Sequence, residues 1–183
     1  MCQGLLAFHQ RNILHRDIKS DNVFLTDDGD VKLADLGFSV FLTEERHERT
    51  TQCGTISWLA PELISGKPYS KSVDIWALGV TAYECATFLP PFLHKDKTQV
   101  KLMIMTCRVP KIFSCYSEQF QDFIDRCLER KVEERWDIAM LCQHEFLQGA
   151  ASLKDNWVRE LKAHKELVRK AKSRERRNTN RMR

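Results

Sequence analysis

The sequence predicts a mainly α-helical domain that carries one small β-hairpin. Hydrophobic residues make up 43% of the 183 residues and charged residues 30%, a composition typical of a folded globular domain with a core. Two short apolar runs surround an Asp-Gly turn near residue 29, and this pattern indicates a hairpin. After Pro61 the apolar residues recur mostly at helical spacing, so the remainder of the chain is expected to be helical.

The N-terminal part of the chain is expected to contain a helix end, the hairpin and a long loop. Residues 3–9 have the pattern of the last turns of a helix. Residues 22–25 and 31–34 are the two apolar runs that we expect to pair around the turn. Residues 38–57 are polar and lack periodicity, which predicts a long loop, and such loops in compact domains are often functional.

The helical part begins with the most apolar segment of the chain. Residues 72–88 are apolar almost all round, which is typical of a buried central helix. Helical spacing continues through 98–106, 118–128 and 137–143. The tail, residues 152–178, places four apolar side chains on roughly one face: Leu153, Trp157, Leu161 and Val168.

Charge marks a boundary near Gly149. Residues 151–183 carry twelve Lys and Arg against four Asp and Glu, a balance of +8, whereas residues 1–150 carry seventeen against twenty-one, a balance of −4. We therefore expect a domain over residues 1–148 and a basic helical tail over 149–183. Such a run can bind nucleic acid, anionic lipid or a nuclear import receptor, but we favour a solvated helix and do not expect a nucleic-acid partner.

Composition also bears on the compartment. The number of cysteines is seven, an odd number, and no two have Cys-x-x-Cys spacing, which argues against a disulfide framework or a zinc ribbon. The first residues lack the basic start and apolar core of a signal peptide. Residues 75–92 are too short and too interrupted to span a membrane. We expect a cytoplasmic protein, with a nuclear location left open by the basic tail.

Three short motifs carry the chemistry. The segment His15-Arg-Asp-Ile-Lys-Ser-Asp-Asn22 matches the kinase catalytic-loop pattern H-R-D-x-x-x-x-N at every specified position. Asp35-Leu-Gly37 resembles the D-F-G triplet with Leu in place of Phe, and Ala60-Pro-Glu62 matches A-P-E. Each motif alone is weak evidence, but their order and spacing together point to a protein kinase.

Further residues extend the resemblance. Gly54-Thr55 precedes Trp58 as in the G-T-x-x-W segment of protein kinases, and Asp74-Ile-Trp76 resembles the start of their central helix. The segment HRDIKSDN is similar to the corresponding segment of the p21-activated, Ste20-like group of serine/threonine kinases, and the resemblance covers residues 1 to about 148. It implies the C-terminal lobe of a protein-kinase-like fold without the N-terminal lobe. It also implies transfer of the γ-phosphate of ATP to Ser and Thr hydroxyls of protein substrates.

The resemblance assigns four residues to phosphoryl transfer. Asp17 would accept or orient the proton of the substrate hydroxyl, and Lys19 would place a cation at the γ-phosphate of ATP. Asn22 and Asp35 would hold Mg²⁺, which prefers hard oxygen ligands. Residues 22 and 35 flank the expected hairpin, and an antiparallel turn brings its two ends together.

The resemblance also implies regulatory and structural residues. Arg16 would bind a phosphothreonine on the 38–57 loop, either Thr51 or its neighbour Thr50, modified by an upstream kinase or by autophosphorylation. Thr55 would lie near Asp17 and Lys19. The remaining residues are expected to be structural: His15 and Asp74 beneath the catalytic loop, and Glu62 with Arg135 as a buried bidentate ion pair.

Some family elements are absent from this sequence. The Gly-rich loop, the V-A-I-K lysine and the helix-C glutamate precede the catalytic loop in the family, but only fourteen residues precede His15 here. We therefore expect little or no activity from the isolated chain, and small-GTPase regulation only through segments outside it. A non-catalytic kinase relative that acts as a binding or decoy module stays open as an alternative. The 38–57 loop and Ala60-Pro-Glu62 argue against a small-molecule phosphotransferase.

Overall fold

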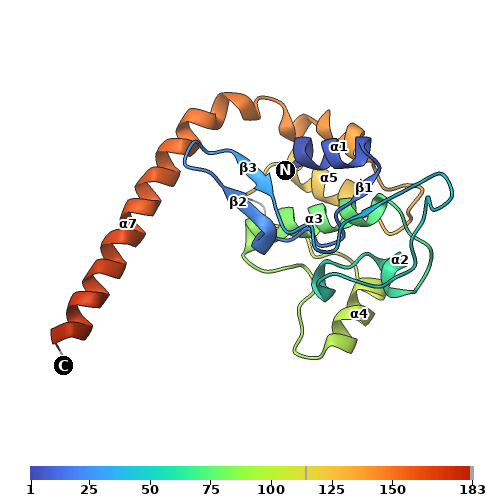
Figure 1. Cartoon of the computed structure of the whole chain (residues 1–183), viewed down its shortest axis with the longest axis horizontal. Coiled ribbons are helices and arrows are strands. Elements are labelled where there is room, and N and C mark those ends of the chain that lie inside the picture. The colour runs from blue at the N-terminus through green and yellow to red at the C-terminus, as the bar shows by residue number, and fades with distance from the viewer. Residues whose placement is uncertain (114, 182–183) are drawn as a thin grey trace. The chain divides into compact units, whose positions relative to one another are not determined.

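The structure, a computed structural model, describes residues 1–113 and 115–181, with side chains described as far as residue 173. Helices predominate, and the strands are two or three residues long (Figure 1). In chain order the elements are α1 (Cys2–Gln10), β1 (Ile13–Leu14), η1 (Ser20–Asn22), β2 (Val23–Leu25), β3 (Val31–Leu33), β4 (Val40–Phe41), η2 (Ile56–Trp58), α2 (Pro61–Ile64), α3 (Ser72–Thr87), α4 (Lys97–Thr106), α5 (Glu118–Cys127), α6 (Ile138–Cys142), η3 (Glu145–Leu147), η4 (Ala150–Leu153) and α7 (Lys154–Arg181). The predicted fold class, mainly α with a small hairpin, is confirmed.

Contacts divide the chain into two units. The first comprises residues 1–24 and 32–147, and the second comprises residues 25–31 and 148–183. In the first unit α3 is the central helix, with most of its side chains buried, and it packs against α5, while α1 packs against α6. The near-continuous apolar sequence of α3 explains this burial, because such a helix has no polar face to expose.

The contact between α3 and α5 depends on a glycine. A Cβ atom built on Gly79 of α3 would lie 2.5 Å from Cys127 Cβ and 2.9 Å from Leu128 Cδ2, both closer than two carbon atoms can approach. Only a residue without a side chain allows the two helices to pack this closely. The buried face of α5 has the matching helical spacing, with Phe120, Phe123, Ile124 and Cys127 in the core.

We expect Gly79→Ala to lower the free energy of unfolding by about 1–3 kcal/mol, because the added methyl group forces the α3–α5 contact apart. Urea denaturation monitored by circular dichroism measures the change. Gly4→Ala is the matched control, since Gly4 is also helical but its Cβ would meet only the Leu33 side chain, at an ordinary 3.8 Å from Cδ1 and 4.0 Å from Cγ. Alanine favours helix over glycine, so the control should be neutral or stabilising. Equal stability for the two variants would contradict the close packing.

The predicted hairpin is present, and the predicted loop contains short strands. Hydrogen bonds from Ala34 N to Asn22 O (2.9 Å) and from Thr26 N to Asp30 O (2.9 Å) mark the two ends of the β2–β3 pair. Within residues 38–57, β4 pairs antiparallel with β1, and η2 forms the last turn. Arg49 forms a bridge with Tyr69, each amide donating to the other's carbonyl oxygen. The loop is therefore anchored at two places along its length, by the β1–β4 pair and by the Arg49–Tyr69 bridge.

The second unit consists of the hairpin tip and the tail. Lys154 and Lys165 of the tail form ion pairs with Asp30 (2.6 Å) and Asp27 (2.5 Å) of the turn. Gly29, at φ 77°, lies against Trp157 and Val158, which leave no room for a side chain there. The predicted helix over 152–178 corresponds to the end of η4 and to α7, and its basic side chains from residue 174 onward lie outside the described residues.

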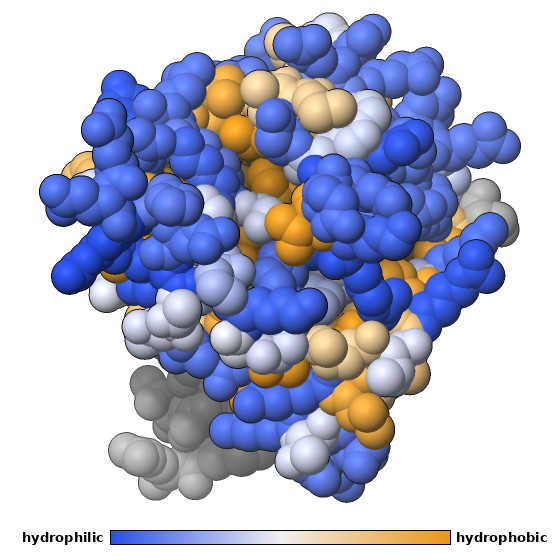
Figure 2. Space-filling model, turned by 90° about the vertical axis from the view of Figure 1, so that its right-hand side faces the viewer, coloured by the Kyte–Doolittle hydropathy of each residue, from blue (hydrophilic) through white to orange (hydrophobic). Residues whose placement is uncertain are grey.

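The surface is mainly hydrophilic on the face shown in Figure 2, with small groups of hydrophobic residues between the polar ones. Several large apolar side chains in the hairpin and in the segment that follows it are nevertheless exposed: Phe24 at 58%, Leu36 at 53%, Phe38 at 45% and Phe41 at 65%. In the part of the chain that the structure describes, no helix is both long and apolar enough to cross a membrane.

Candidate active site

The catalytic-loop motif, residues 15–22, directly follows β1 and ends in η1, and a buried carboxylate holds its backbone. Asp74, at the start of α3, is fully buried and accepts hydrogen bonds from the amides of His15 (2.9 Å) and Arg16 (2.8 Å). His9 of α1 adds a third contact, 2.9 Å from Asp74 Oδ2. Arg16 has a left-handed backbone with φ 67°, which is strained for a long side chain. Asp74 therefore stabilises a loop conformation that the chain alone would not favour.

His15 gives the loop a second attachment. Its side chain is buried, and Nε2 lies 3.2 Å from the carbonyl oxygen of Ala34, the residue before Asp35. This contact joins the catalytic-loop motif to the Asp35-Leu-Gly37 motif. The structure places both His15 and Asp74 beneath the loop, and neither contacts the carboxylate of Asp17.

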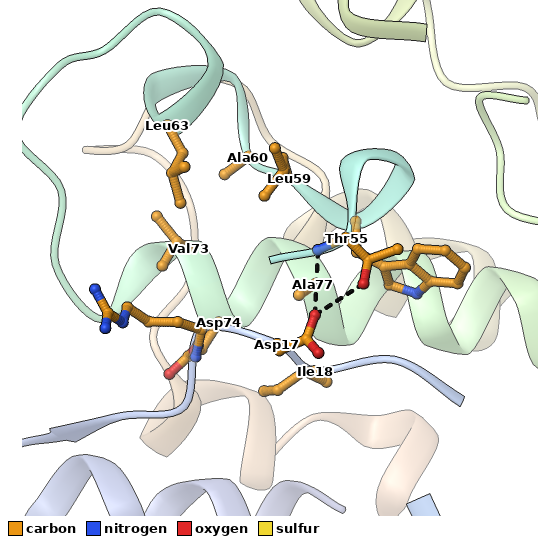
Figure 3. Close-up of a pocket in the computed structure, with 11 residues that line it drawn as sticks. Asp17, Ile18, Thr55, Leu59, Ala60, Leu63, Val73, Asp74 and Ala77 are labelled. Atoms are coloured by element: carbon orange, nitrogen blue, oxygen red, sulfur yellow. Dashed lines mark hydrogen bonds between the residues drawn. The ribbon is translucent and has the colours of Figure 1, made fainter. Parts of the chain in front are cut away.

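Asp17 is the centre of a dense polar cluster. Its Oδ1 accepts hydrogen bonds from the Thr55 amide (3.1 Å) and the Thr55 hydroxyl (2.9 Å), as drawn in Figure 3. Its Oδ2 lies 2.9 Å from Lys19 Nζ and accepts a hydrogen bond from Asn22 Nδ2 at 3.1 Å. Lys19 Nζ also donates to the Thr55 hydroxyl at 2.8 Å. Three other sequence-predicted residues, Lys19, Asn22 and Thr55, thus lie within hydrogen-bonding distance of Asp17.

The cluster keeps Asp17 ionised. Burial alone acts to raise the pKa of this carboxyl group, but the hydrogen bonds from Lys19, Thr55 and Asn22 and the charge of Lys19 outweigh it, so the pKa lies below its ordinary value. Asp17 is consequently a carboxylate at neutral pH, with every lone-pair direction constrained by a neighbour. The cavity that Asp17 lines together with Thr55 measures about 10 Å³, room for about one water molecule.

Asn22 and Asp35 flank the hairpin, since Asn22 directly precedes β2 and Asp35 follows β3. The hydrogen bond from Ala34 N to Asn22 O brings the two segments together. The side-chain amide nitrogen of Asn22 donates to Asp17, which directs its oxygen away from that carboxylate. Asp35 has a left-handed backbone with φ 61°, is exposed, and uses Oδ1 to accept a hydrogen bond from Gly37 N at 3.2 Å.

These two side chains fit part of a magnesium site. Both offer oxygen ligands, which Mg²⁺ prefers, and an ion held by one or two protein ligands takes the rest from water and substrate phosphates. Among the described side chains, residues 1–113 and 115–173, no group of three or more His, Cys, Asp or Glu could hold a metal on its own. The donor set therefore suits a metal that arrives with a phosphate ligand better than a resident structural ion.

The arginine of the motif contacts the loop that follows. Arg16 Nε donates to Phe38 O at 2.6 Å, and Nη1 donates to the Tyr69 hydroxyl at 3.1 Å. Tyr69 in turn donates to the carbonyl oxygen of Thr51 at 2.7 Å, while the Thr51 side chain is exposed. Burial raises the pKa of Tyr69, so its hydroxyl remains protonated and keeps this bridge.

Tyr69 was missed in the sequence analysis. The signal that could have identified it is weak, because an aromatic residue shortly before a helix is usually a packing residue. Ser20 was also missed: its hydroxyl donates to Glu84 Oε1 at 2.9 Å and ties the catalytic loop to α3. A hydroxyl and a carboxylate 64 residues apart in the chain leave no pattern that a single sequence reveals.

Glu62 and Arg135 form the expected bidentate ion pair. Nη1 of Arg135 lies 2.7 Å from Oε1 of Glu62, and Nη2 lies 3.1 Å from Oε2. Both side chains are buried. Arg135 also donates to the carbonyl oxygens of Ser72 (2.9 Å) and Glu129 (2.7 Å), and its guanidinium lies over the Trp76 ring at 5.2 Å. The pair anchors the end of the 52–62 segment to the core.

Comparison with known proteins gives the family. Residues 1–147 match the protein kinase domain. The chain is 41% identical over 152 residues to serine/threonine-protein kinase pakB of Dictyostelium discoideum. This match covers 82% of this chain and 18% of that protein. It is 42% identical over 153 residues to serine/threonine-protein kinase pak-1 of Caenorhabditis elegans, and 41% identical over 153 residues to serine/threonine-protein kinase PAK 1 of Mus musculus. These two matches cover 82% of this chain and 27% and 28% of the relatives.

The chain thus spans less than a third of the length of these relatives. The matching region contains the catalytic-loop motif, the hairpin and the helices that support them. Its fold is the mainly helical lobe that the resemblance implies. The chain belongs to the protein kinase family and, within it, to the p21-activated, Ste20-like group of serine/threonine kinases.

Proposed function

We propose that this chain forms the catalytic face of an ATP-dependent kinase that phosphorylates Ser and Thr hydroxyls of protein substrates. The observation that carries the proposal is the cluster in which Asp17 Oδ1 and Oδ2 contact Thr55 and Lys19. Phosphoryl transfer requires little covalent chemistry from the protein, so positioning and charge neutralisation dominate catalysis. A constrained carboxylate beside a constrained ammonium group supplies both.

Each residue of the cluster has a role in this proposal. Asp17 orients the substrate hydroxyl and accepts its proton. Lys19, which lies 2.9 Å from that carboxylate, offers its ammonium group to the γ-phosphate that is being transferred. Thr55 contacts both side chains and holds them at their observed separation. Asn22 and Asp35 would hold Mg²⁺, which neutralises charge on the phosphates of ATP.

The loop before Thr55 is the proposed regulatory segment. Phosphorylation of Thr51, by an upstream kinase or by autophosphorylation, would place a dianion near Arg16, with Thr50 as the neighbouring candidate. The Arg16–Tyr69–Thr51 contacts support this assignment, because they already join the arginine to the backbone of that threonine. A phosphate there would add charge-assisted hydrogen bonds to Arg16.

The exposed apolar side chains near the hairpin support a missing partner surface. Phe24, Leu36, Phe38 and Phe41 are all more than two-fifths exposed, and isolated domains rarely leave such a group uncovered. We propose that an N-terminal lobe covers them and supplies the remaining contacts to ATP. Small-GTPase regulation would act through such segments.

All seven cysteines are free thiols, which is typical of proteins in the reducing cytoplasm or nucleus. We propose that the protein is located in the cytoplasm.

The experiment that tests the proposal uses the longest natural product that contains this chain. An immunoblot with an antibody against residues 152–173 measures its mass, and the purified product is assayed with Mg²⁺ and γ-labelled ATP on matched Ser, Thr and Tyr peptides. We expect a mass well above 21.4 kDa and transfer to Ser and Thr peptides but not to Tyr. A 21.4 kDa product without transfer would favour the non-catalytic binding module instead.

A further inference from the structure

A second cavity lies in the first unit, away from the Asp17 cluster. Its volume is about 430 Å³, and its walls come from the C-terminal half of α1, the start of α3 and the segment that leads into α6. Pockets that hold small molecules have volumes of roughly 300–1,000 Å³ and mostly apolar walls with a few polar groups. The apolar part of the wall consists of Leu6, Ile75, Val132, Trp136, Ile138 and Ala139.

The polar part of the wall contains one cation, Lys71, that no carboxylate among the described residues neutralises. Arg135 is paired with Glu62, and His9 lies 2.9 Å from Asp74, so both of these carry a buried partner. Lys71 differs, because its Nζ donates at 2.7 Å to the neutral side-chain oxygen of Asn12. Among the described residues, no carboxylate oxygen lies within 4.0 Å of Lys71 Nζ.

The one acidic side chain in the wall is already engaged. Asp137 accepts a hydrogen bond from Met140 N at 2.8 Å and thereby caps the N-terminus of α6. An anion that enters the cavity would therefore be drawn to its Lys71 end, and an apolar group would contact the remaining wall. A ligand with an apolar body and one terminal negative charge matches both features.

We propose that this cavity binds a small amphipathic carboxylate, with its apolar part against Ile75, Trp136 and Ile138 and its carboxylate paired with Lys71. The site is distinct from the phosphoryl-transfer residues and does not depend on the activity of the chain. It is a ligand site on the lobe itself, formed wholly by residues of the first unit.

The position of the cavity also couples it to the catalytic loop. His9 and Arg135 line it, and each holds one of the two buried carboxylates, Asp74 and Glu62, that anchor the loop and the segment after it. A ligand that restrains His9 would also restrain Asp74. Through Asp74 it would restrain the amides of His15 and Arg16, which donate hydrogen bonds to that carboxylate. Binding should therefore slow hydrogen exchange of these two amides.

The test is a calorimetric titration of the chain with sodium decanoate, and with decanol as the uncharged analogue. Ala139→Trp fills the cavity from an exposed helix position, so it should abolish binding of both probes while the chain stays folded. Lys71→Gln should weaken decanoate about tenfold, the effect of losing one charge-assisted hydrogen bond, and leave decanol unchanged. Ala163→Trp and Lys67→Gln are the matched controls, since neither residue lines the cavity.

Each outcome decides part of the proposal. Saturable decanoate binding that Ala139→Trp removes and Ala163→Trp keeps supports the site. Binding that survives Ala139→Trp, or no saturable binding at all, overturns it. Equal affinity for decanoate and decanol, or an unchanged affinity in Lys71→Gln, overturns the assignment of the carboxylate to Lys71. Unchanged exchange at His15 and Arg16 in the saturated chain overturns the coupling to the catalytic loop.

Discussion

Replacing Arg135 with Met is expected to lower the free energy of unfolding by about 3–5 kcal/mol, because it leaves the Glu62 carboxylate buried without its counter-charge. The loss also removes the hydrogen bonds that Arg135 donates to Ser72 O and Glu129 O. A small domain is stable by only about 5–15 kcal/mol, so this variant should sit near the limit of folding at physiological temperature.

Equilibrium urea unfolding measures this effect, and a double-mutant cycle isolates the ion pair. Glu62→Leu alone leaves the Arg135 guanidinium buried without a counter-charge. The double variant removes both charges and should recover a large part of the lost free energy of unfolding. The control is Lys131→Met, which removes a lysine from an exposed pair with Glu134 at 2.7 Å. Exposed pairs contribute little, so Lys131→Met should leave the denaturation midpoint nearly unchanged. If the denaturation midpoint of Arg135→Met were as close to that of wild type as the midpoint of Lys131→Met is, the Glu62–Arg135 pair would not anchor the core.

The fold could be predicted where local sequence alone decides the structure. The Asp27-Asp-Gly-Asp30 turn predicts the hairpin because a glycine with positive φ suits a tight turn, and Gly29 has φ 77°. The span of α3 follows from its apolar sequence, within one residue at its C-terminus. Even Phe88, which ends α3 with a left-handed φ of 65°, lies at the predicted end of the helix.

Other parts of the fold depend on contacts that a single sequence does not encode locally. The β1–β4 pair joins Ile13 and Leu14 to Val40 and Phe41, and strands of two residues have no periodicity to detect. The 38–57 segment was predicted as a loop for the same reason. Its anchors at Arg49 and Tyr69 come from opposite sides of the Ala60-Pro-Glu62 motif, and only the folded chain brings them together.

The candidate site shows the same division. Asp17, Lys19 and Asn22 come from one short motif, so their closeness follows from the local chain, whereas Thr55 lies 38 residues away and was expected near them only from the family resemblance. The motifs did not identify His9, whose ring lies 2.9 Å from Asp74, because that contact joins helices 65 residues apart. Nor did they reveal the Lys71 cavity, whose walls come from three separate segments.

The second large expected effect is the loss of activity in the Asp17→Asn variant, in which one carboxylate oxygen is replaced by an amide nitrogen. Asparagine keeps the size of the side chain and an acceptor oxygen for Thr55, but it carries no charge and takes up no proton at neutral pH. If Asp17 acts as the base of phosphoryl transfer, kcat should fall about 10²–10⁴-fold, the range by which positioned acid–base groups contribute. The KM for ATP should change little, since the variant leaves Asn22 and Asp35 in place.

A steady-state assay of the longest natural product, with kcat and KM measured separately, provides the test. Asp28→Asn is the matched control, because Asp28 is an exposed carboxylate of the hairpin turn that is not part of the Asp17 cluster, and the kcat of this variant should equal that of wild type. The thermal midpoint of Asp17→Asn must stay near that of wild type, so that lost activity reports chemistry rather than unfolding. A folded Asp17→Asn variant that keeps more than about a tenth of wild-type kcat would remove Asp17 from the proton transfer. The Lys19–Thr55 pair would then be left as positioning groups around a base supplied by solvent or substrate.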